Sequence, residues 1–363
     1  MAEQTWRTCH PVQGVSAMKQ LKVGIIGIQG FGRRHAELLT TVPNVAIRAA
    51  CDIREEALAG FARQYGIPQT FTDYRDMLAQ ADVDCVTIAT PHHLHPRMVT
   101  DALLAGKHVL CEKPLAIRAA DADIMVALAK QKRLKLACHY IFRLAPQIIG
   151  LKKAYDAGLL GEVYYVSMRW LARHTDFWFR EDTGWRVVKA QAGGGILIGR
   201  GSHLIDAIWY VLGKPPVTSV YATCSNRLVG QEVEDFAAAS IRFANGCQVN
   251  LECSYVLHLP EHEQRHEYEV YGTKGGAIAR LLGARPGLFV GRCELPGNEW
   301  TDLLPVIGDE TSKAEPSSVI EDFILAVRED RPPLVSGEDA AIITHIIEAA
   351  YRSADEGREI KLE

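Results

Sequence analysis

Between Leu21 and Arg143, short runs of hydrophobic residues alternate with longer segments in which hydrophobic residues recur at helical spacing. Short continuous apolar runs are typical of strands buried on both faces of a parallel sheet, and the longer segments leave room for helical crossovers. We therefore predict a doubly wound parallel sheet. Its strands are expected at 21–27, 45–52, 85–91 and 108–114, and its helices at 33–42, 54–66, 95–106 and 118–133.

The pattern changes after Arg143, where strand-like segments follow one another directly. An open, mostly antiparallel sheet is predicted from segments at 162–170, 219–225, 235–256 and 266–272, with turns at 244–246 and 272–276. Flanking helices are expected at 146–158, 203–213, 319–330 and 338–357. The chain is thus predicted to be an α/β protein, with a doubly wound domain at 21–142 and an α+β domain at 143–363. Residues 1–20 are expected to be a disordered extension.

Composition fits a globular chain. With 363 residues, of which 48% are hydrophobic and 23% charged, the chain can form two domains with cores of their own. A net charge of −4 offers no electrostatic footprint for nucleic acid, and no apolar run is long enough to cross a membrane. The nine cysteines stand singly and no secretory signal is visible, so a cytoplasmic protein with reduced thiols is expected.

A glycine-rich turn, GIIGIQGFGRRH, lies where the first predicted strand passes into the first helix. A backbone free of side chains can approach a pyrophosphate there, and the helix N-terminus supplies amide donors. Gly27 and Gly32 match the first and third glycines of the dinucleotide fingerprint, but Gln29 occupies the middle position and Gly30 is displaced by one. We expect the loop to shift so that Gly30 is used, with Gln29 and Phe31 beside the cofactor.

The second predicted strand ends at Asp52, 20 residues after Gly32. A carboxylate at this place can accept the ribose hydroxyls of a dinucleotide, and it repels a 2′-phosphate. NAD is therefore favoured as cofactor. NADP stays open, because Arg54 or Arg48 could hold the phosphate.

The chain resembles the Gfo/Idh/MocA family of oxidoreductases from Leu21 to its C-terminus. The resemblance is carried by VTIATPHHLHPRMVTDALLAGKHVLCEKPLA, RLAPQIIGLKKAYDAGLLGEV, GGGILIGRGSHLID, YEVYGTKGG and the segment from IEDFILAVRED onward. The EKP strand combined with the glycine–histidine helix is far more specific than the glycine loop. The resemblance implies an N-terminal Rossmann domain and a C-terminal domain that binds substrate.

By this resemblance, Lys113 of EKP lies at the nicotinamide end of the cleft and touches the substrate hydroxyl. An ammonium there lowers the pKa of a nearby alcohol or stabilises a developing alkoxide. The resemblance also places Glu112 near the nicotinamide ribose and implies a cis peptide at Pro114. The remaining expected cofactor contacts are Thr90, Pro91 and His95.

His203 matches the histidine of the second motif, whose pKa near neutrality suits it to accept the proton of a substrate hydroxyl. The family motif has an aspartate one turn earlier, where this chain has Gly199. Lys113 and His203 are therefore expected to act as the catalytic pair, and Gly199 is compatible with a larger or differently oriented substrate. Asp206 either orients His203 or is structural. Arg200 either meets an anionic substrate group or forms a salt bridge; the other expected substrate contacts are His93, Arg143 and Trp185.

Two histidine patterns resemble metal sites, but neither is expected to bind a metal. HEQRH at 262–266 matches a zinc signature that requires a helix, but the following HEYEVYG alternates as a strand, on which the two histidines would lie about 13 Å apart. HHLH at 92–95 begins a helix next to the cofactor, where His95 is expected to brace the turn.

Together these features predict an NAD(P)-dependent dehydrogenase or reductase. It would act on a secondary alcohol of a sugar, polyol or related polyhydroxy compound. Two alternatives stay open: a non-catalytic dinucleotide-binding sensor, and redox-assisted elimination or hydrolysis of glycosides. A homodimer or homotetramer is expected, because an open sheet with strands such as QVNLECSYV would leave an apolar face uncovered.

Overall fold

The computed structural model describes residues 20–173, 181–260, 263–282, 287–292, 300–303 and 316–362. Residues 1–19 of the predicted N-terminal extension lie outside this set. The described helices include none that is both long and apolar enough to span a bilayer.

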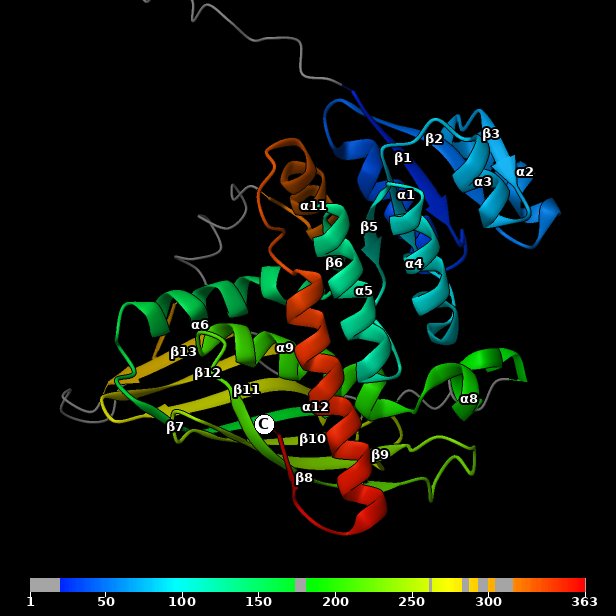
Figure 1. The fold of residues 1–363 in the computed structure, drawn as a ribbon. Helices are drawn as coiled ribbons and strands as arrows, with labels where there is room; N and C mark the ends of the chain where they lie inside the picture. The colour runs from blue at the N-terminus through cyan, green and yellow to red at the C-terminus, as the bar shows by residue number, and fades with distance from the viewer. Residues whose placement is uncertain are drawn as a thin grey trace, which may run out of the picture.

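The N-terminal half forms a six-stranded parallel sheet in the order β3-β2-β1-β4-β5-β6 (Figure 1). The strands are β1 (Leu21–Ile26), β2 (Val45–Cys51), β3 (Gln69–Phe71), β4 (Cys85–Ile88), β5 (His108–Cys111) and β6 (Leu136–Cys138). The helices between them are α1 (Phe31–Thr41), α2 (Glu55–Tyr65), α3 (Tyr74–Gln80), α4 (His95–Leu104) and α5 (Ala119–Lys132). The strand order reverses between β1 and β4, and ligands of such sheets bind at this reversal.

The second half forms a nine-stranded mixed sheet in the order β14-β13-β12-β11-β7-β10-β9-β8-β15. Its strands are β7 (Val163–Leu171), β8 (Val217–Ser225), β9 (Phe236–Phe243), β10 (Gln248–Ser254), β11 (Arg265–Gly272), β12 (Gly275–Leu282), β13 (Gly287–Arg292), β14 (Trp300–Asp302) and β15 (Ile360–Lys361). Among the described residues, every strand pair in this sheet is antiparallel except β10 with β7. The predicted fold class is confirmed.

Helices cover one face of this second sheet (Figure 1). They are α6 (Pro146–Asp156), α9 (Ser202–Val211) and α12 (Gly337–Glu356), and α11 (Val319–Arg328) packs on α1 of the first domain. Shorter helical segments are η1 (His92–Leu94), η2 (Ile141–Leu144), η3 (Glu181–Val187), α8 (Lys189–Ala192) and the π-helix η4 (Leu197–Gly201). The segments η1, η3, α8 and η4 gather where the two domains meet.

The open face of the second sheet is polar, which corrects the expectation of an uncovered apolar face. In β10, Val249, Leu251 and Cys253 are buried, while the alternate residues Gln248, Asn250 and Glu252 point the other way. The same outward face carries an ion-pair cluster in which Arg169 contacts Glu252, Glu267 and Glu269. The sequence predicts strands at these positions, but it is their polar side chains that lie on the open face and their apolar side chains that lie under the helices.

Candidate active site

The glycine turn places three glycines where side chains would not fit or would be strained. A Cβ on Gly27, which has φ 83°, would lie 2.6 Å from the carbonyl oxygen of Ala89, and one on Gly32 would lie 1.8 Å from that of Gly27. Gly30 has φ 50° with open space around it, and it is the residue before α1. The first turn of α1 contains no acidic residue. A phosphate can therefore approach the N-terminus of α1 beside Gly30, with Gln29 and Phe31 exposed next to it.

Asp52 lies directly after β2 and is tied to this turn. One carboxylate oxygen accepts the backbone N–H of Ile28 at 3.1 Å, and the other accepts the backbone N–H of Arg54 at 3.1 Å. The Arg54 guanidinium also approaches that carboxylate, at 3.4 Å. Arg48 lies within the strand, four residues before Asp52, and its charge acts on Asp82. Of the two arginines considered for a 2′-phosphate, only Arg54 is next to Asp52.

Glu112 is buried at the end of β5 between two histidines. Its Oε1 accepts hydrogen bonds from His35 Nε2 at 3.0 Å and from His139 Nδ1 at 2.7 Å, and its Oε2 accepts the backbone N–H of Lys113 at 3.2 Å. Burial alone would raise the pKa of Glu112, but the charge and hydrogen bonds of His139 and His35 hold it well below its usual range. These contacts fix the orientation of the carboxylate, and its expected position near the nicotinamide ribose stays a prediction.

A cavity of about 310 Å³ opens where the two domains meet, and this size is typical of small-molecule sites. The first domain contributes the exposed ring of Phe31 as well as His92 and Lys113. The second domain contributes the rest of the described lining: Trp185, Arg186, Ala192, Gly194, Gly195, Gly199, Arg200 and Tyr255. Of the expected site residues, the structure therefore brings together Phe31, Lys113, Trp185 and Arg200 at one cavity.

Lys113 is held at this cavity by the π-helix of the second domain. Its Nζ donates a hydrogen bond to the carbonyl oxygen of Gly199 at 2.7 Å. Burial lowers the pKa of Lys113 to about 8, with a further contribution from the positive charge of Arg200. The Lys113–Pro114 peptide bond is cis, as the resemblance implied. Single π-turns are common at functional sites, and this one presents Gly199 toward the lysine.

His203 lies in α9 behind this lining and is almost fully buried. Its ring packs edge-on against Tyr140 at 5.4 Å and at a tilt of 39° against Phe142 at 4.7 Å, and its Nδ1 has no hydrogen-bond partner. Burial lowers the pKa of His203 well below 6.5, and the charges of Lys113 and Arg200 lower it further. The ring is therefore neutral at pH 7 and able to accept a proton.

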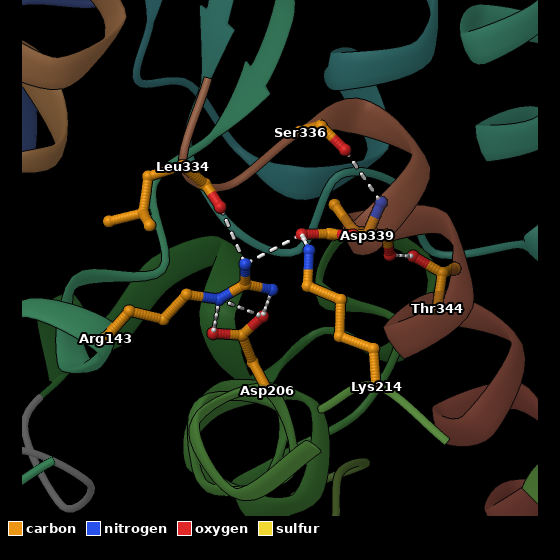
Figure 2. Close-up of polar contacts among 8 residues, drawn as sticks. Arg143, Asp206, Lys214, Leu334, Ser336, Asp339 and Thr344 are labelled. Atoms are coloured by element: carbon orange, nitrogen blue, oxygen red, sulfur yellow. Dashed lines mark hydrogen bonds and ion pairs between the residues drawn. The ribbon is translucent and has the colours of Figure 1, made fainter. Parts of the chain in front are cut away.

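Asp206 does not bind His203, and its role is structural (Figure 2). Both its oxygens accept hydrogen bonds from Arg143, the shortest at 2.6 Å. Arg143 also donates to the carbonyl of Leu334 and to Asp339, each at 2.7 Å, and Lys214 donates to Asp339 at 2.6 Å. Arg143 and Asp206 are 1% and 0% exposed, so their expected contacts with substrate are wrong: they belong to a buried ion-pair cluster.

Two family models account for most of the chain. The description "Oxidoreductase family, NAD-binding Rossmann fold" (GFO_IDH_MocA) matches residues 21–140, and "Oxidoreductase family, C-terminal alpha/beta domain" matches residues 152–362. The chain belongs to the Gfo/Idh/MocA family of oxidoreductases. The glycine turn and Asp52 fit NAD, which is the cofactor of this oxidoreductase.

Named relatives of this oxidoreductase act on sugars and polyols. The chain is 30% identical to D-glucoside 3-dehydrogenase of Escherichia coli (strain K12), covering 94% of this chain and 97% of that protein. It is 25% identical to myo-inositol 2-dehydrogenase of Thermotoga maritima, with 94% and 99% covered. Among solved structures, GenD2 from gentamicin A biosynthesis in complex with NAD is 27% identical with a TM-score of 0.78, and 99% and 100% of the two chains are covered.

Other predicted contacts of the oxidoreductase are placed differently. His95 is fully buried, and its two ring nitrogens lie 2.8 Å and 2.9 Å from the carbonyls of Pro114 and Thr90, so it braces the turn and has no polar atom left for the cofactor. Thr90 and Pro91 are half-buried at the end of β4. His93 is absent from the described lining of the cavity, where His92 takes its place and contacts the ring of Trp185 at 4.6 Å.

Sequence reasoning missed Tyr255 and Arg186. Tyr255 follows β10, and its hydroxyl would lie 3.1 Å from a Cβ on Gly199. Arg186 stacks on Trp185, at 4.7 Å from the ring centre. Neither residue stands at a recognisable spacing from Lys113 or His203, so no local signal could have found them. His266 of the HEQRH pattern lies on β11, as predicted, with its ring against Phe142 and Trp170; His262 lies outside the described residues.

Proposed function

We propose that this oxidoreductase is an NAD-dependent dehydrogenase that acts on a secondary alcohol carbon of a sugar, polyol or related polyhydroxy compound. The observation that carries the proposal is the Lys113 ammonium, held by the Gly199 carbonyl at a cavity beside the end of β5. The glycine turn that fits NAD belongs to the same end of the sheet. The names of the relatives support the substrate class.

Lys113 and His203 divide the proton work in this proposal. The substrate hydroxyl hydrogen-bonds to Lys113, whose ammonium stabilises the alkoxide that develops as the proton leaves. The His203 ring accepts that proton: burial lowers its pKa well below 6.5, which keeps the ring neutral before the transfer and makes it a weak base. NAD, when bound, supplies the hydride acceptor for oxidation and the donor, as NADH, for reduction.

The proposal is tested first by screening sugars, polyols and sugar acids with NAD while nicotinamide absorbance is followed. With a substrate found, Lys113→Met and His203→Ala should each lower kcat by about 100-fold, the usual scale of general acid–base catalysis. NADH affinity should change less than about threefold, because the pyrophosphate and ribose contacts lie elsewhere. Lys107→Met is a matched control, because the Lys107 amine also donates to a backbone carbonyl, that of Val83, at 2.8 Å.

Two results would count against this assignment. Near-normal turnover in His203→Ala would remove the histidine from the mechanism. A failure of every sugar, polyol and sugar acid to reduce NAD, with NADH still binding, would remove the dehydrogenase function and favour a dinucleotide-binding sensor.

We further propose a cytoplasmic homodimer or homotetramer. The open sheet face supports assembly, because the half-buried rings of Tyr165 and Tyr271 stack there at 6.1 Å. The described cysteines support a reducing compartment: all seven are free, and six of them are buried. Light scattering that returned only monomer at micromolar concentration would contradict the assembly.

A further inference from the structure

The described lining of the cavity is rich in hydrogen-bond donors and positive charge. Lys113, Arg186 and Arg200 carry cationic groups, and Trp185 and Tyr255 add an indole N–H and a phenol O–H. The residue before Lys113 is Glu112, and its buried carboxylate accepts hydrogen bonds from two histidines. Such a lining is complementary to a ligand that offers acceptors and negative charge.

Arg200 is the cation whose surroundings are most informative. Its guanidinium lies 4.6 Å from the ring centre of Trp170 and 5.9 Å from that of Tyr255. Within the part of the chain that the structure describes, Arg200 pairs with no carboxylate, whereas Arg143 and Arg169 each contact two or more. The two aromatic faces orient the guanidinium, and the Tyr255 hydroxyl accepts a hydrogen bond from it. The remaining N–H donors of its fork suit a planar anion.

The charge of Arg200 acts on the whole site. It contributes to the lowered pKa values of Lys113, His203 and His266, in each case after the larger effect of burial. The positive charges of the cavity therefore repel one another in the free protein. A bound anion next to Arg200 would relieve this repulsion and favour the protonated form of Lys113.

We propose that the substrate is an anionic sugar derivative whose carboxylate or phosphate group is bound by Arg200, with the Tyr255 hydroxyl beside it. This inference rests on the proposed dehydrogenase function, and it narrows the substrate class from polyhydroxy compounds in general to sugar acids or sugar phosphates. Arg200 directly follows Gly199, whose carbonyl holds Lys113. The residue that binds the anion and the residue that positions the lysine are therefore neighbours in the same π-helix.

The test uses matched probes that differ in one group: D-glucose, D-glucuronate and D-glucose 6-phosphate, and the corresponding galactose series. The ratio kcat/KM with NAD is measured for the wild type, Arg200→Gln, Arg200→Lys and the control Arg352→Gln, which removes an exposed arginine of α12.

The wild type should prefer one class of anion over the neutral sugar by at least about tenfold, and the preferred class distinguishes carboxylate from phosphate. Arg200→Gln should lower kcat/KM for that anion by about 10–100-fold more than for the neutral sugar, the range of a charge-assisted hydrogen bond. Arg200→Lys should recover part of the loss, and Arg352→Gln should match the wild type.

A calorimetric titration of the NADH-loaded protein with D-glucuronate, D-glucose 6-phosphate and D-glucose separates the two proposals. Anions that bind more tightly than glucose through Arg200, without any turnover, would support the anion site and contradict the dehydrogenase function. Turnover of neutral sugars in preference to their anions would keep the function and overturn this inference. An Arg200→Gln variant that lost affinity equally for charged and neutral probes would also overturn it.

Discussion

The surroundings of Lys113 disfavour the protonated, positively charged form of its amine. Burial and the neighbouring Arg200 bring its pKa to about 8, only slightly above neutral pH. The same two influences keep His203 neutral. A cationic donor and a neutral acceptor can therefore coexist around one substrate hydroxyl near pH 7, without a carboxylate between them.

This arrangement predicts the pH dependence of the reaction. The kcat/KM for alcohol oxidation should be level near pH 7 and should fall above about pH 8, since raising the pH through the pKa of Lys113 removes the proton that stabilises the alkoxide. Lys113→Arg keeps its charge at these pH values and should lose the alkaline decline, at a lower overall rate. A pH–rate profile with NAD measures this. A rate that rises through pH 8 would instead show Lys113 acting as a neutral base.

Gly199 leaves a narrow space facing Tyr255. A Cβ there would lie 3.1 Å from the Tyr255 hydroxyl, tighter than an ordinary contact. Gly199→Asp should lower kcat/KM by about tenfold or more, because the added carboxylate crowds Tyr255 and neutralises the cationic cavity. Gly199→Ala adds the same Cβ without the charge and should cost less. Steady-state kinetics of both variants on one substrate decide this, and a Gly199→Asp enzyme as active as the wild type would contradict it.

The sequence identifies Lys113 and His203 because each lies in a contiguous motif. It could not identify Tyr255, which follows a strand of the second domain and meets Gly199 only through the packing of η4 on β10. The hydrogen-bond partners of Glu112 could not be identified for the same reason. Glu112 follows β5, whereas His35 lies in α1 and His139 in the segment after β6.

At the scale of elements, α9 is anchored by charge rather than by hydrophobic packing alone. Asp206 binds Arg143 of η2, and Arg143 in turn binds Asp339 in the first turn of α12 (Figure 2). The buried guanidinium thus joins three helical segments that are distant in sequence. Removing one partner of such a cluster leaves a buried charge uncompensated.

Asp206→Asn should therefore lower the free energy of unfolding by about 3–5 kcal/mol. The turnover of the protein that remains folded should change little, because Asp206 does not touch His203. Urea denaturation and kinetics at low temperature measure the two effects. Asp156→Asn is the control: it breaks an exposed pair with Lys152 in α6 and should cost under about 1 kcal/mol. A stable variant with a large loss of turnover would restore a catalytic role to Asp206.

Strands with a continuous apolar run and long periodic helices were predictable, and shorter or irregular elements were not. Strands β1, β2, β4 and β5 and helices α5 and α12 lie within a few residues of their predicted ranges. The three-residue strands β3 and β6 and the seven-residue helix α3 were not predicted, because three residues are too few for a strand pattern and seven make only two helical turns. The π-helix was also missed, because no residue pattern in GILIGRG distinguishes its wider turn from that of a regular helix.

For the molecule as a whole, buried histidines distributed over both domains make stability depend on pH. Burial lowers the pKa values of His35, His92, His95, His203 and His266 below 6.5. Below pH 6.5 the unfolded chain takes up protons that the folded protein does not, so acid favours unfolding. The stability of the protein should therefore fall steadily as the pH is lowered from 7 to 5.

His266 gives a measurable share of this effect. Burial lowers its pKa from 6.5 to about 3, which corresponds to about 2 kcal/mol of stability lost between pH 7 and pH 5. His266→Phe fits the aromatic cluster with Phe142 and Trp170 and should remove that share. Urea denaturation at the two pH values measures it, with His345→Gln on the surface as control. An unchanged pH dependence in His266→Phe would show that the pKa of His266 is the same in the folded and the unfolded protein.

The path of the chain also sets the order in which the molecule can be completed during synthesis. Strand β6 forms the edge of the first sheet, and it gains its outer partners only from Val335 and Ser336, just before α12 covers α5. About 200 residues separate Cys138 from these partners, which the ribosome adds in roughly 10–40 seconds. For that interval the nascent N-terminal domain carries an open strand edge and an uncovered helix, so a segment translated about 200 residues later is the one that closes the first domain.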